Sequence, residues 1–355
     1  MKLTVGNVRL LEPLSSSRGS EPDHVSIVEA AYELDRGDTA WVDGIVRATA
    51  PLLERGLGVI GYSWRVEQDG QHLVIENPVC FGCPPKLPEA LNRAAELMPA
   101  EGMRDFIVAG PCHTHSKAHG LGADFANTRE VKEALLPLAG ARDMLNVRAT
   151  NPDHASGIAI GACTRNIVNV APRTRAAFGR VAAHIVAAAR LRRAIRHDPT
   201  PSPMPAPEAV FDARGALLHA EGDATSSGAR HALITAVAHV MSSRGSLRKE
   251  SSERALELWR ALVSGRWSIV EHCDTDGKRL ILARKNQASV PQPAALNANE
   301  RLVALYTSWG HSNKLIAYEL GLSASTVSSL LRSALRKLGL SSRSELLRVF
   351  APPSP

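Results

Sequence analysis

The first half of the chain alternates between two spacings of apolar residues. From Thr39 to Gly56 the apolar positions recur at helical spacing, with Val42, Ile45 and Val46 on one side. Residues 57–76 carry strand-like runs on both sides of Asp69-Gly70, a dipeptide typical of tight hairpin turns. The pattern therefore predicts a helix followed by two antiparallel strands.

A second strand pair and a long helix follow. Residues 141–164 have strand-like runs on either side of a turn near "NPDHASG". Residues 172–197 predict one helix with an apolar stripe made of Phe178, Val181, Ala182, Ile185 and Ala189. Over residues 1–197, this order of helix, strand meander and long exit helix resembles a GAF-like α/β sensory domain, in pattern only. The exit helix, which ends near Arg196, is a candidate for dimerisation or signal transmission.

Two proline-rich stretches, "HDPTPSPMPAPEA" and "NQASVPQPAA", divide the chain. Closely spaced prolines favour an extended backbone and cannot continue a helix or a central strand, so we predict linkers at 198–209 and 287–295. Between them, residues 210–286 predict a hairpin, two helices over 231–241 and 251–265, and a second strand pair around Asp276-Gly277. Strands, helices and strands in this order resemble a small PAS-like α/β domain.

The last sixth of the chain predicts four short helices joined by tight turns. A capping residue stands at each helix start and a glycine after each of the first three helices. The caps are Asn297, Ser312, Ser323 and Ser342, and the glycines are Gly310, Gly321 and Gly339. Glutamates follow the first and last caps at capping-box spacing, at Glu300 and Glu345.

The third of these helices has two unlike faces. Its inward positions are Val327, Leu331, Ala334, Leu335 and Leu338, and its outer face carries Ser325, Ser328, Ser329, Arg332 and Arg336. A polar, partly basic helix held on an apolar support is the arrangement that fits the DNA major groove in helix-turn-helix proteins. Residues 296–350 contain seven basic and three acidic residues, so a net charge of +4 out of the chain's +7 falls here. That surplus suits contact with phosphates.

Residues 296–350 resemble the LuxR/GerE-type DNA-binding domain. The family pattern runs L-T-x-R-E, G-x-S-N-K-x-I-A, L-x-x-S-x-x-T-V, K-L-G and S-R-x-x-L. The matching positions are Leu296, Glu300, Gly310, Ser312, Asn313, Lys314, Ile316, Ala317, Leu320, Ser323, Thr326, Val327, Lys337, Leu338, Gly339, Ser342, Arg343 and Leu346. The resemblance implies a transcriptional regulator that binds a roughly palindromic site as a dimer. It places base and phosphate contacts just after T-V, at Ser328, Ser329 and Arg332.

From the resemblance and the helix faces together we predict one DNA-binding set. It comprises Asn313, Lys314, Ser323, Ser325, Thr326, Ser328, Ser329, Arg332, Arg336 and Lys337. A small helical interaction module that does not touch DNA is the structural alternative for this segment.

The chain departs from the family at the reading helix. The family often has Lys or Arg where this chain has Ser328, and His where it has Leu330. Arg332 then carries more of the remaining contact to DNA. Leu330 either touches a thymine methyl group or packs against the first helix of the segment. Asn297 and Asn299 replace the family's Thr and Arg, and Asn is an equally good cap.

The composition and the missing motifs exclude several classes of protein but do not indicate a function by themselves. The sequence contains no apolar run of about 18 residues and no signal-peptide pattern, and five cysteines are too few for a disulfide scaffold. We therefore expect a reduced, cytoplasmic protein without membrane contact. No Gly-rich phosphate loop or Ser/His/Asp spacing is present, so we expect neither an enzyme nor a cofactor. The expected partners are double-stranded DNA, a second copy of the chain and an unknown small-molecule or protein signal.

The prediction for the whole chain is a multidomain α+β protein. GAF-like (1–197) and PAS-like (210–286) sensor-type modules precede an all-α four-helix LuxR-type helix-turn-helix domain (296–350).

One group of residues favours a different class of sensor. Cys80 and Cys83 have C-x-x-C spacing, and "PCHTHSKAH" adds Cys112, His113 and His115. Such residues bind zinc or form a redox pair in other proteins. The spacing matches no structural zinc signature, so buried or loop thiols and solvated histidines are the expected reading. A metal- or redox-responsive sensor is kept as the alternative function.

Overall fold

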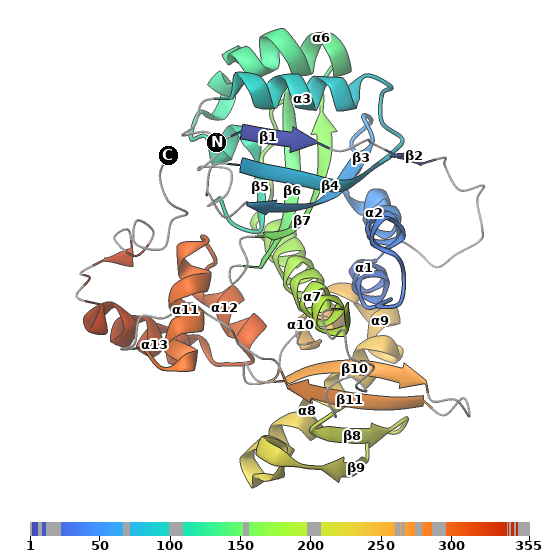
Figure 1. The fold of residues 1–355 in the computed structure, drawn as a ribbon, viewed down its shortest axis with the longest axis vertical. Coiled ribbons are helices and arrows are strands. Elements are labelled where there is room, and N and C mark those ends of the chain that lie inside the picture. The colour runs from blue at the N-terminus through green and yellow to red at the C-terminus, as the bar shows by residue number, and fades with distance from the viewer. Residues whose placement is uncertain are drawn as a thin grey trace.

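A large sheet, a small sheet and a group of C-terminal helices meet around one long helix, α7 (Pro172–Arg196), as Figure 1 shows. The computed structural model describes residues 2–5, 9–11, 23–66, 72–98, 109–151, 156–196, 207–259, 263, 267–273, 279–285, 296–338, 340, 342–343 and 346. The two proline-rich linkers and the three hairpin turns predicted near residues 70, 153 and 277 lie outside these ranges, apart from Pro207–Ala209. Within them, no helix is long and apolar enough to cross a bilayer.

The large sheet is built from the two predicted strand pairs. β3 (Val59–Val66) and β4 (His72–Phe81) form the first pair, and β6 (Asp143–Asn151) and β7 (Ser156–Thr164) form the second. β3 and β7 join the pairs antiparallel, and β5 (Cys112–Thr114) extends the sheet beyond β6. β1 (Lys2–Val5) and β2 (Arg9–Leu11) pair parallel to β4. Among the described residues the order is β1-β4-β3-β7-β6-β5.

Alternate residues of these strands point to two separate cores. Val59, Val79 and Leu145 face α1 (His24–Ala31), α2 (Asp38–Leu53) and α7. Their neighbours Ile60, Cys80 and Met144 face the other side, under α3 (Leu87–Leu97), the π-helical turn η2 (Val131–Leu135) and α6 (Leu136–Ala139). Because both faces are covered, even polar strand residues such as Asn146 and Arg148 of β6 are buried.

The small sheet has the order β10-β11-β8-β9. It consists of the predicted hairpin, β8 (Ala209–Asp212) and β9 (Leu217–Ala220), and the predicted closing pair, β10 (Trp267–Cys273) and β11 (Arg279–Lys285). Three helices accompany it: α8 (Ser227–Arg244), α9 (Ser246–Glu250) and α10 (Ser252–Leu258). Its core residues, such as Val237 and Ile281, belong to the same continuous apolar cluster as α1 and α7. The two predicted sensor modules therefore share a core.

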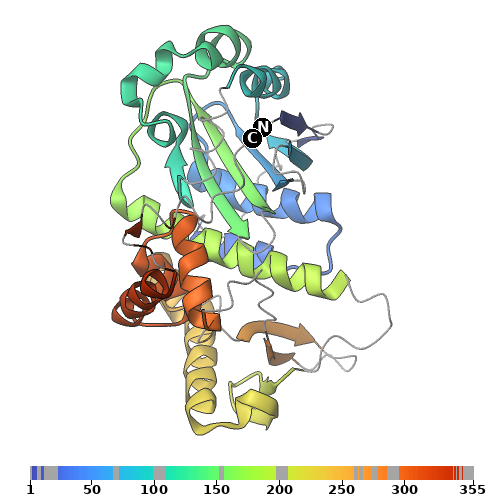
Figure 2. The same cartoon turned by 60° about the vertical axis from the view of Figure 1, so that its left-hand side comes forward.

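The stripe on α7 does not provide a free dimerisation surface. Phe178, Val181 and Ile185 are buried inside this chain, in the cluster that includes α1 and the large sheet. The opposite side of the helix is also covered, because α7 contacts α10 and α12 (Asn313–Leu320). Figure 2 shows α7 lying between the large sheet and the helices below it. A second copy of the chain cannot reach the stripe in this arrangement, so its candidacy as a dimer contact is corrected.

Short elements complete the described fold. They are the helix α5 (His115–Ala118) and the 3-10 turns η1 (Gly122–Asn127) and η4 (Gly222–Thr225). α5 and η1 follow β5 at the edge of the large sheet, and η4 precedes α8.

Candidate nucleic-acid interface

Three consecutive helices near the C-terminus have the capping predicted for them. In α11 (Ala298–Ser308), Asn297 Oδ1 accepts from the Glu300 amide at 2.8 Å, and Glu300 Oε2 accepts from the Asn297 amide at 2.9 Å. Ser312 and Ser323 cap α12 and α13 (Ala324–Lys337) in the same way. Gly321 ends α12 at φ +64°, a left-handed conformation that glycine adopts without strain. The fourth predicted helix lies mostly outside the described residues, which here include Ser342, Arg343 and Leu346.

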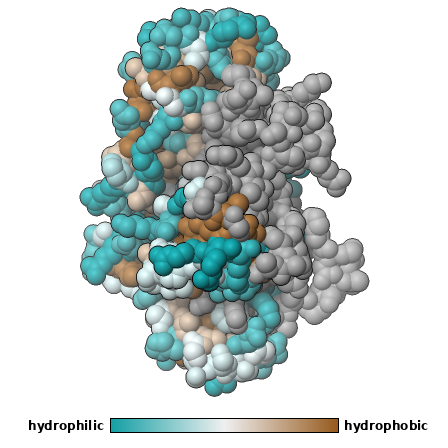
Figure 3. Space-filling model, turned by 90° about the vertical axis from the view of Figure 1, so that its left-hand side faces the viewer, coloured by the Kyte–Doolittle hydropathy of each residue, from teal (hydrophilic) through white to brown (hydrophobic). Residues whose placement is uncertain are grey.

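The third helix, α13, separates a buried face from a polar one. Val327, Leu331 and Ala334 are buried against α11 and α12. The exposed positions Ser325, Ser329, Arg332 and Arg336 follow at spacings of four, three and four residues, which places them on the opposite side of the helix. Figure 3 faces the side on which these helices lie, and strongly hydrophilic residues run across its middle. We define Ser325, Ser329, Arg332 and Arg336 as the outer face of α13.

The cations nearest this face have no acidic partner. Within the described part of the chain, Lys314, Arg332 and Arg336 make no ion pair, and all three are exposed. Lys314 lies in the first turn of α12, and the two arginines lie on α13. These three charges are therefore available to an external anion.

Other predicted residues are engaged inside the fold. The Ser328 hydroxyl donates to the Ala324 carbonyl at 2.9 Å and accepts from Asn313 Nδ2 at 3.1 Å, which ties α12 to α13. Ser323 Oγ accepts from the Thr326 amide at 3.0 Å. Leu330 is half-buried and packs against the apolar core of these helices, which favours the packing role over contact with a thymine methyl.

Lys337 closes a polar junction between the first and third helices. Its Nζ lies 2.7 Å from Glu300 Oε2, and Ser333 Oγ donates to Glu300 Oε1 at 2.7 Å. The hydrogen bond from Lys337, followed by those from the Asn297 amide and Ser333, lowers the pKa of Glu300 to about 2. One carboxylate thus caps α11 and holds α13. Sequence comparison suggested a DNA contact for Lys337, whereas the structure gives its ammonium an internal partner.

Comparison with known families decides the identity of this segment. Residues 294–350 match the model described as bacterial regulatory proteins, luxR family. These residues form a LuxR-type helix-turn-helix domain. No curated protein matches the chain. The LuxR-type domain makes the protein a DNA-binding transcription regulator.

The LuxR-type domain is docked on the rest of the chain through buried aromatic residues. Tyr318 of α12 donates its hydroxyl hydrogen to the backbone carbonyls of Leu256, at 2.6 Å, and Trp259. On α11, Trp309 packs against Trp64 of β3 with ring centroids 6.2 Å apart, and the Tyr306 hydroxyl accepts from Arg190 of α7 at 2.6 Å. The residues in each of these contacts are more than fifty positions apart in the sequence, so no local sequence pattern predicted the contacts.

The Cys/His candidates do not come together as a metal site. Cys80 and Cys83 form a disulfide, so neither offers a thiolate, and the expectation of reduced thiols was wrong for this pair. Cys80 packs under α3, whereas Cys112 belongs to the core on the opposite face of the sheet. Among the described residues no group of three or more His, Cys, Asp or Glu side chains is placed to hold a metal ion. The candidate set is therefore split by the sheet.

His113 is buried and His115 is half-buried. His113 Nδ1 lies 2.8 Å from the Gly110 carbonyl, and His115 packs edge-on against Phe125. Burial lowers the pKa of His115 to about 3 and that of His113 well below its ordinary value, so both are neutral near pH 7. Burial also raises the pKa of the Cys112 thiol to about 12. The expectation of solvated histidines was wrong for this pair, and the expectation of a buried thiol is confirmed for Cys112.

Proposed function

We propose that the protein is a sequence-specific regulator whose α13 enters the DNA major groove. The observation that carries this proposal is the outer face of α13, where Arg332 and Arg336 are exposed, without an ion pair to any described residue, opposite a buried apolar face. A helix with these two sides can be held rigidly by its own domain while it presents donors to base edges.

The predicted contact residues divide by position. Ser329 and Arg332 lie in the middle of the outer face and are assigned to base edges. Lys314, Ser325, Thr326 and Arg336 lie toward the ends of α12 and α13 and are assigned to phosphates. Asn313, Ser323, Ser328 and Lys337 have internal partners, and we assign them to positioning the reading helix.

The test begins with selection of DNA sites by the full-length protein in vitro. On the selected site, Arg332→Ala should cost about 1–3 kcal/mol of binding free energy and relax the preference at one base position. Ser342→Ala, a change outside α13, serves as the matched control and should leave the base preference unchanged. Unchanged affinity and preference in the Arg332 variant would refute this assignment.

We also propose that the α/β part is sensory and that the regulator acts as a homodimer in the cytoplasm, without enzymatic activity. The proposed boundaries are 1–197 for a GAF-like module, 210–286 for a PAS-like module and 296–350 for the LuxR-type domain. The docking of α12 on α7 and α10 supports a regulatory role, because a signal received there meets the DNA-binding domain directly. Sedimentation of a monomer both with and without its DNA site would refute the dimer.

A further inference from the structure

A cavity lies where α1 meets α8, α10 and the small sheet. Its volume is about 370 Å³, within the range of small-molecule sites. Tyr32 and Trp259 form an aromatic wall, with nearly parallel rings whose centroids are 6.3 Å apart. Ile269 and Ile281 of the small sheet add an apolar wall. The cavity thus combines residues from both α/β segments of the chain.

Two polar atoms in the cavity lining are buried without a hydrogen-bond partner. They are the hydroxyl of Tyr32 and Nε of Arg244, and neither has a partner among the described residues. Burial raises the pKa of Tyr32, so its hydroxyl keeps its proton, and Arg244 Nε carries a hydrogen in the charged guanidinium. A buried donor without an acceptor costs free energy. A ligand with an acceptor atom between these two groups would therefore be stabilised here.

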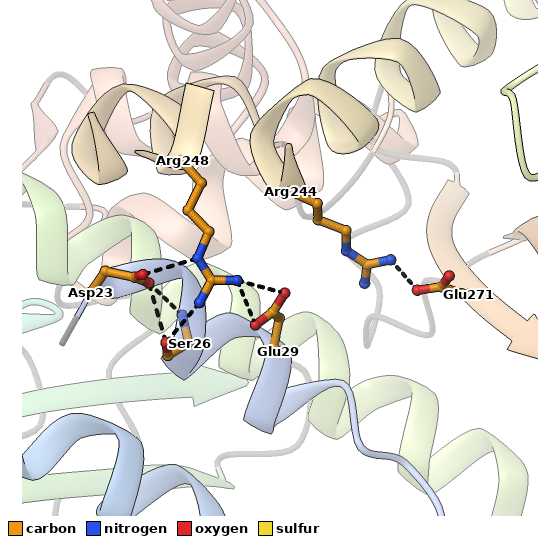
Figure 4. A network of polar contacts seen from close by, with 6 residues as sticks. All are labelled: Asp23, Ser26, Glu29, Arg244, Arg248 and Glu271. Carbon is orange, nitrogen blue, oxygen red and sulfur yellow. Dashed lines mark hydrogen bonds and ion pairs between the residues drawn. The ribbon is translucent and has the colours of Figure 1, made fainter. Parts of the chain in front are cut away.

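Arg244 shares its carboxylate partner with a second cation. Arg244 and Arg279 both pair with the same carboxylate, that of Glu271. The guanidinium of Arg244 also lies over the Trp259 ring, 4.9 Å from its centroid, which fixes its plane. Figure 4 shows Arg244 reaching from α8 toward Glu271.

The acidic side chains of the lining are matched elsewhere. Glu29 is held by Arg248 of α9, whose Nη1 lies 2.9 Å from Glu29 Oε2 and whose Nε lies 2.9 Å from Asp23 Oδ2, as Figure 4 also shows. Glu33 pairs with Arg36 at 2.6 Å on the exposed side. Glu29 and Glu33 therefore each have a cationic partner of their own, although Glu29 also acts electrostatically on Arg244.

We propose that this cavity binds a small organic carboxylate with a flat, apolar body. The carboxylate accepts hydrogen bonds from the Tyr32 hydroxyl and Arg244 Nε, and the body lies against Trp259, Ile269 and Ile281. This is the ligand class that satisfies both unpaired donors and the aromatic wall together.

The same tryptophan connects the cavity to the LuxR-type domain. Its ring lines the cavity, and its backbone carbonyl accepts the hydroxyl hydrogen of Tyr318 in α12. His184 of α7 packs edge-on against both Trp259 and Tyr32, and its Nε2 lies 2.7 Å from the Tyr318 oxygen. A ligand that shifts Trp259 or Tyr32 thus changes the contacts that hold α12 against the rest of the chain. This coupling, unlike ligand binding itself, rests on the proposed DNA-binding function.

The first experiment measures binding without DNA. Phenylacetate is titrated calorimetrically into the full-length protein, with phenylacetamide and phenethylamine as neutral and cationic probes of the same body. Phenylacetate should bind saturably and most tightly of the three. Tyr32→Phe should weaken it about tenfold without lowering the melting temperature, because the lost hydroxyl has no hydrogen-bond partner among the described residues. Arg244→Lys, which keeps the charge but loses the Nε donor, should weaken it as well.

The outcomes separate cleanly. Absence of saturable phenylacetate binding, equal affinity for all three probes, or binding unaffected by both variants would overturn the cavity proposal. Tyr306→Phe is the control, because its hydroxyl lies outside the cavity and pairs with Arg190.

The second experiment measures affinity for the selected DNA site with and without saturating phenylacetate. Coupling predicts a change of at least about fivefold that shrinks in Tyr318→Phe while phenylacetate binding persists. Binding of the probe with no change in DNA affinity would overturn the coupling. Failure of the protein to bind any DNA site would instead refute the proposed function and leave the binding result intact.

Discussion

Tyr318 of α12, in the LuxR-type domain, and His184 of α7 are joined by a buried hydrogen bond of 2.7 Å between Oη and Nε2. Because the tyrosine gives its one hydrogen to the Leu256 and Trp259 carbonyls, Nε2 of His184 must be the donor. The pair places the second helix of a DNA-binding domain in contact with an element 134 residues earlier in the chain.

Removing the Tyr318 hydroxyl tests how much this junction contributes to stability. Tyr318→Phe removes an acceptor from the His184 ring and a hydroxyl donor from two buried carbonyls, so we expect a loss of about 1–3 kcal/mol in the free energy of unfolding. Urea denaturation monitored by tryptophan fluorescence measures it. Tyr306→Phe, at a half-buried contact on α11, should cost less, and equal losses in the two variants would contradict a special role for Tyr318.

His184 should make the protein sensitive to mild acid. Burial lowers the pKa of His184 to about 3 from an ordinary value of 6.5. Between these values the unfolded chain holds a proton that the folded chain excludes, so stability is full above pH 6.5 and falls as the pH drops toward 3. His184→Gln retains an N–H donor and should reduce the slope in this window by up to about 1.4 kcal/mol per pH unit. Denaturation midpoints at several pH values check the slope, and identical slopes would count against it.

Glu300 should act in a lower pH window. Its folded pKa of about 2 lies below the ordinary 4.5, so the stability it contributes is present above pH 4.5 and is lost as the pH falls toward 2. Glu300→Gln can still cap α11 but cannot pair with Lys337, so the variant should be less stable at pH 7 and lose less on acidification. Thermal melts at pH 7 and below pH 4 provide the comparison. A variant that loses as much as the natural protein in this range would disprove the assignment.

Two lysines of the LuxR-type domain should behave differently when removed. Lys314 is exposed and has no ion-pair partner in the described part of the chain, so Lys314→Ala should weaken binding to all DNA sequences and lower the salt slope by about 1. Lys337 is held by Glu300, so Lys337→Ala should lower the melting temperature, with a smaller change in salt slope. Binding assays over a series of salt concentrations, paired with thermal melts, distinguish the two. The assignment fails if the lysines exchange these effects.

The Cys/His residues should be dispensable for metal content. We expect the purified protein to hold less than one equivalent of zinc, and Cys80→Ser combined with Cys83→Ser to leave that content unchanged. The reason is that Cys80 and Cys112 lie on opposite faces of the sheet. Elemental analysis of both proteins decides, and stoichiometric zinc lost in the double variant would restore the metal-sensor alternative.

The helices and hairpins that local chemistry controls were predictable from sequence. Capping residues and glycines set where α11, α12 and α13 begin and end, and strand runs around turn dipeptides predicted the four hairpin strands of the large sheet. The two faces of α13 followed from helical periodicity alone. These signals act over a few residues, so a single sequence contains them fully.

The partners of those elements were not predictable in the same way. The stripe on α7 indicated an apolar contact but could not say whether a second copy or this chain's own sheet would cover it. The pattern likewise predicted a DNA contact for Lys337, and only the fold shows that its ammonium pairs with Glu300.

The sequence by itself determined that the chain ends in a LuxR-type DNA-binding unit, because capping, periodicity and the motif all reside within its last sixth. Only the tertiary structure decided that this unit sits on α7 and α10 through Tyr318, and that Tyr32, Arg244 and Trp259 surround one cavity. The physical reason is that hydrogen bonds and packing between distant segments depend on how whole elements are placed. The sequence around a polar or apolar side chain does not specify which distant residue that side chain will contact.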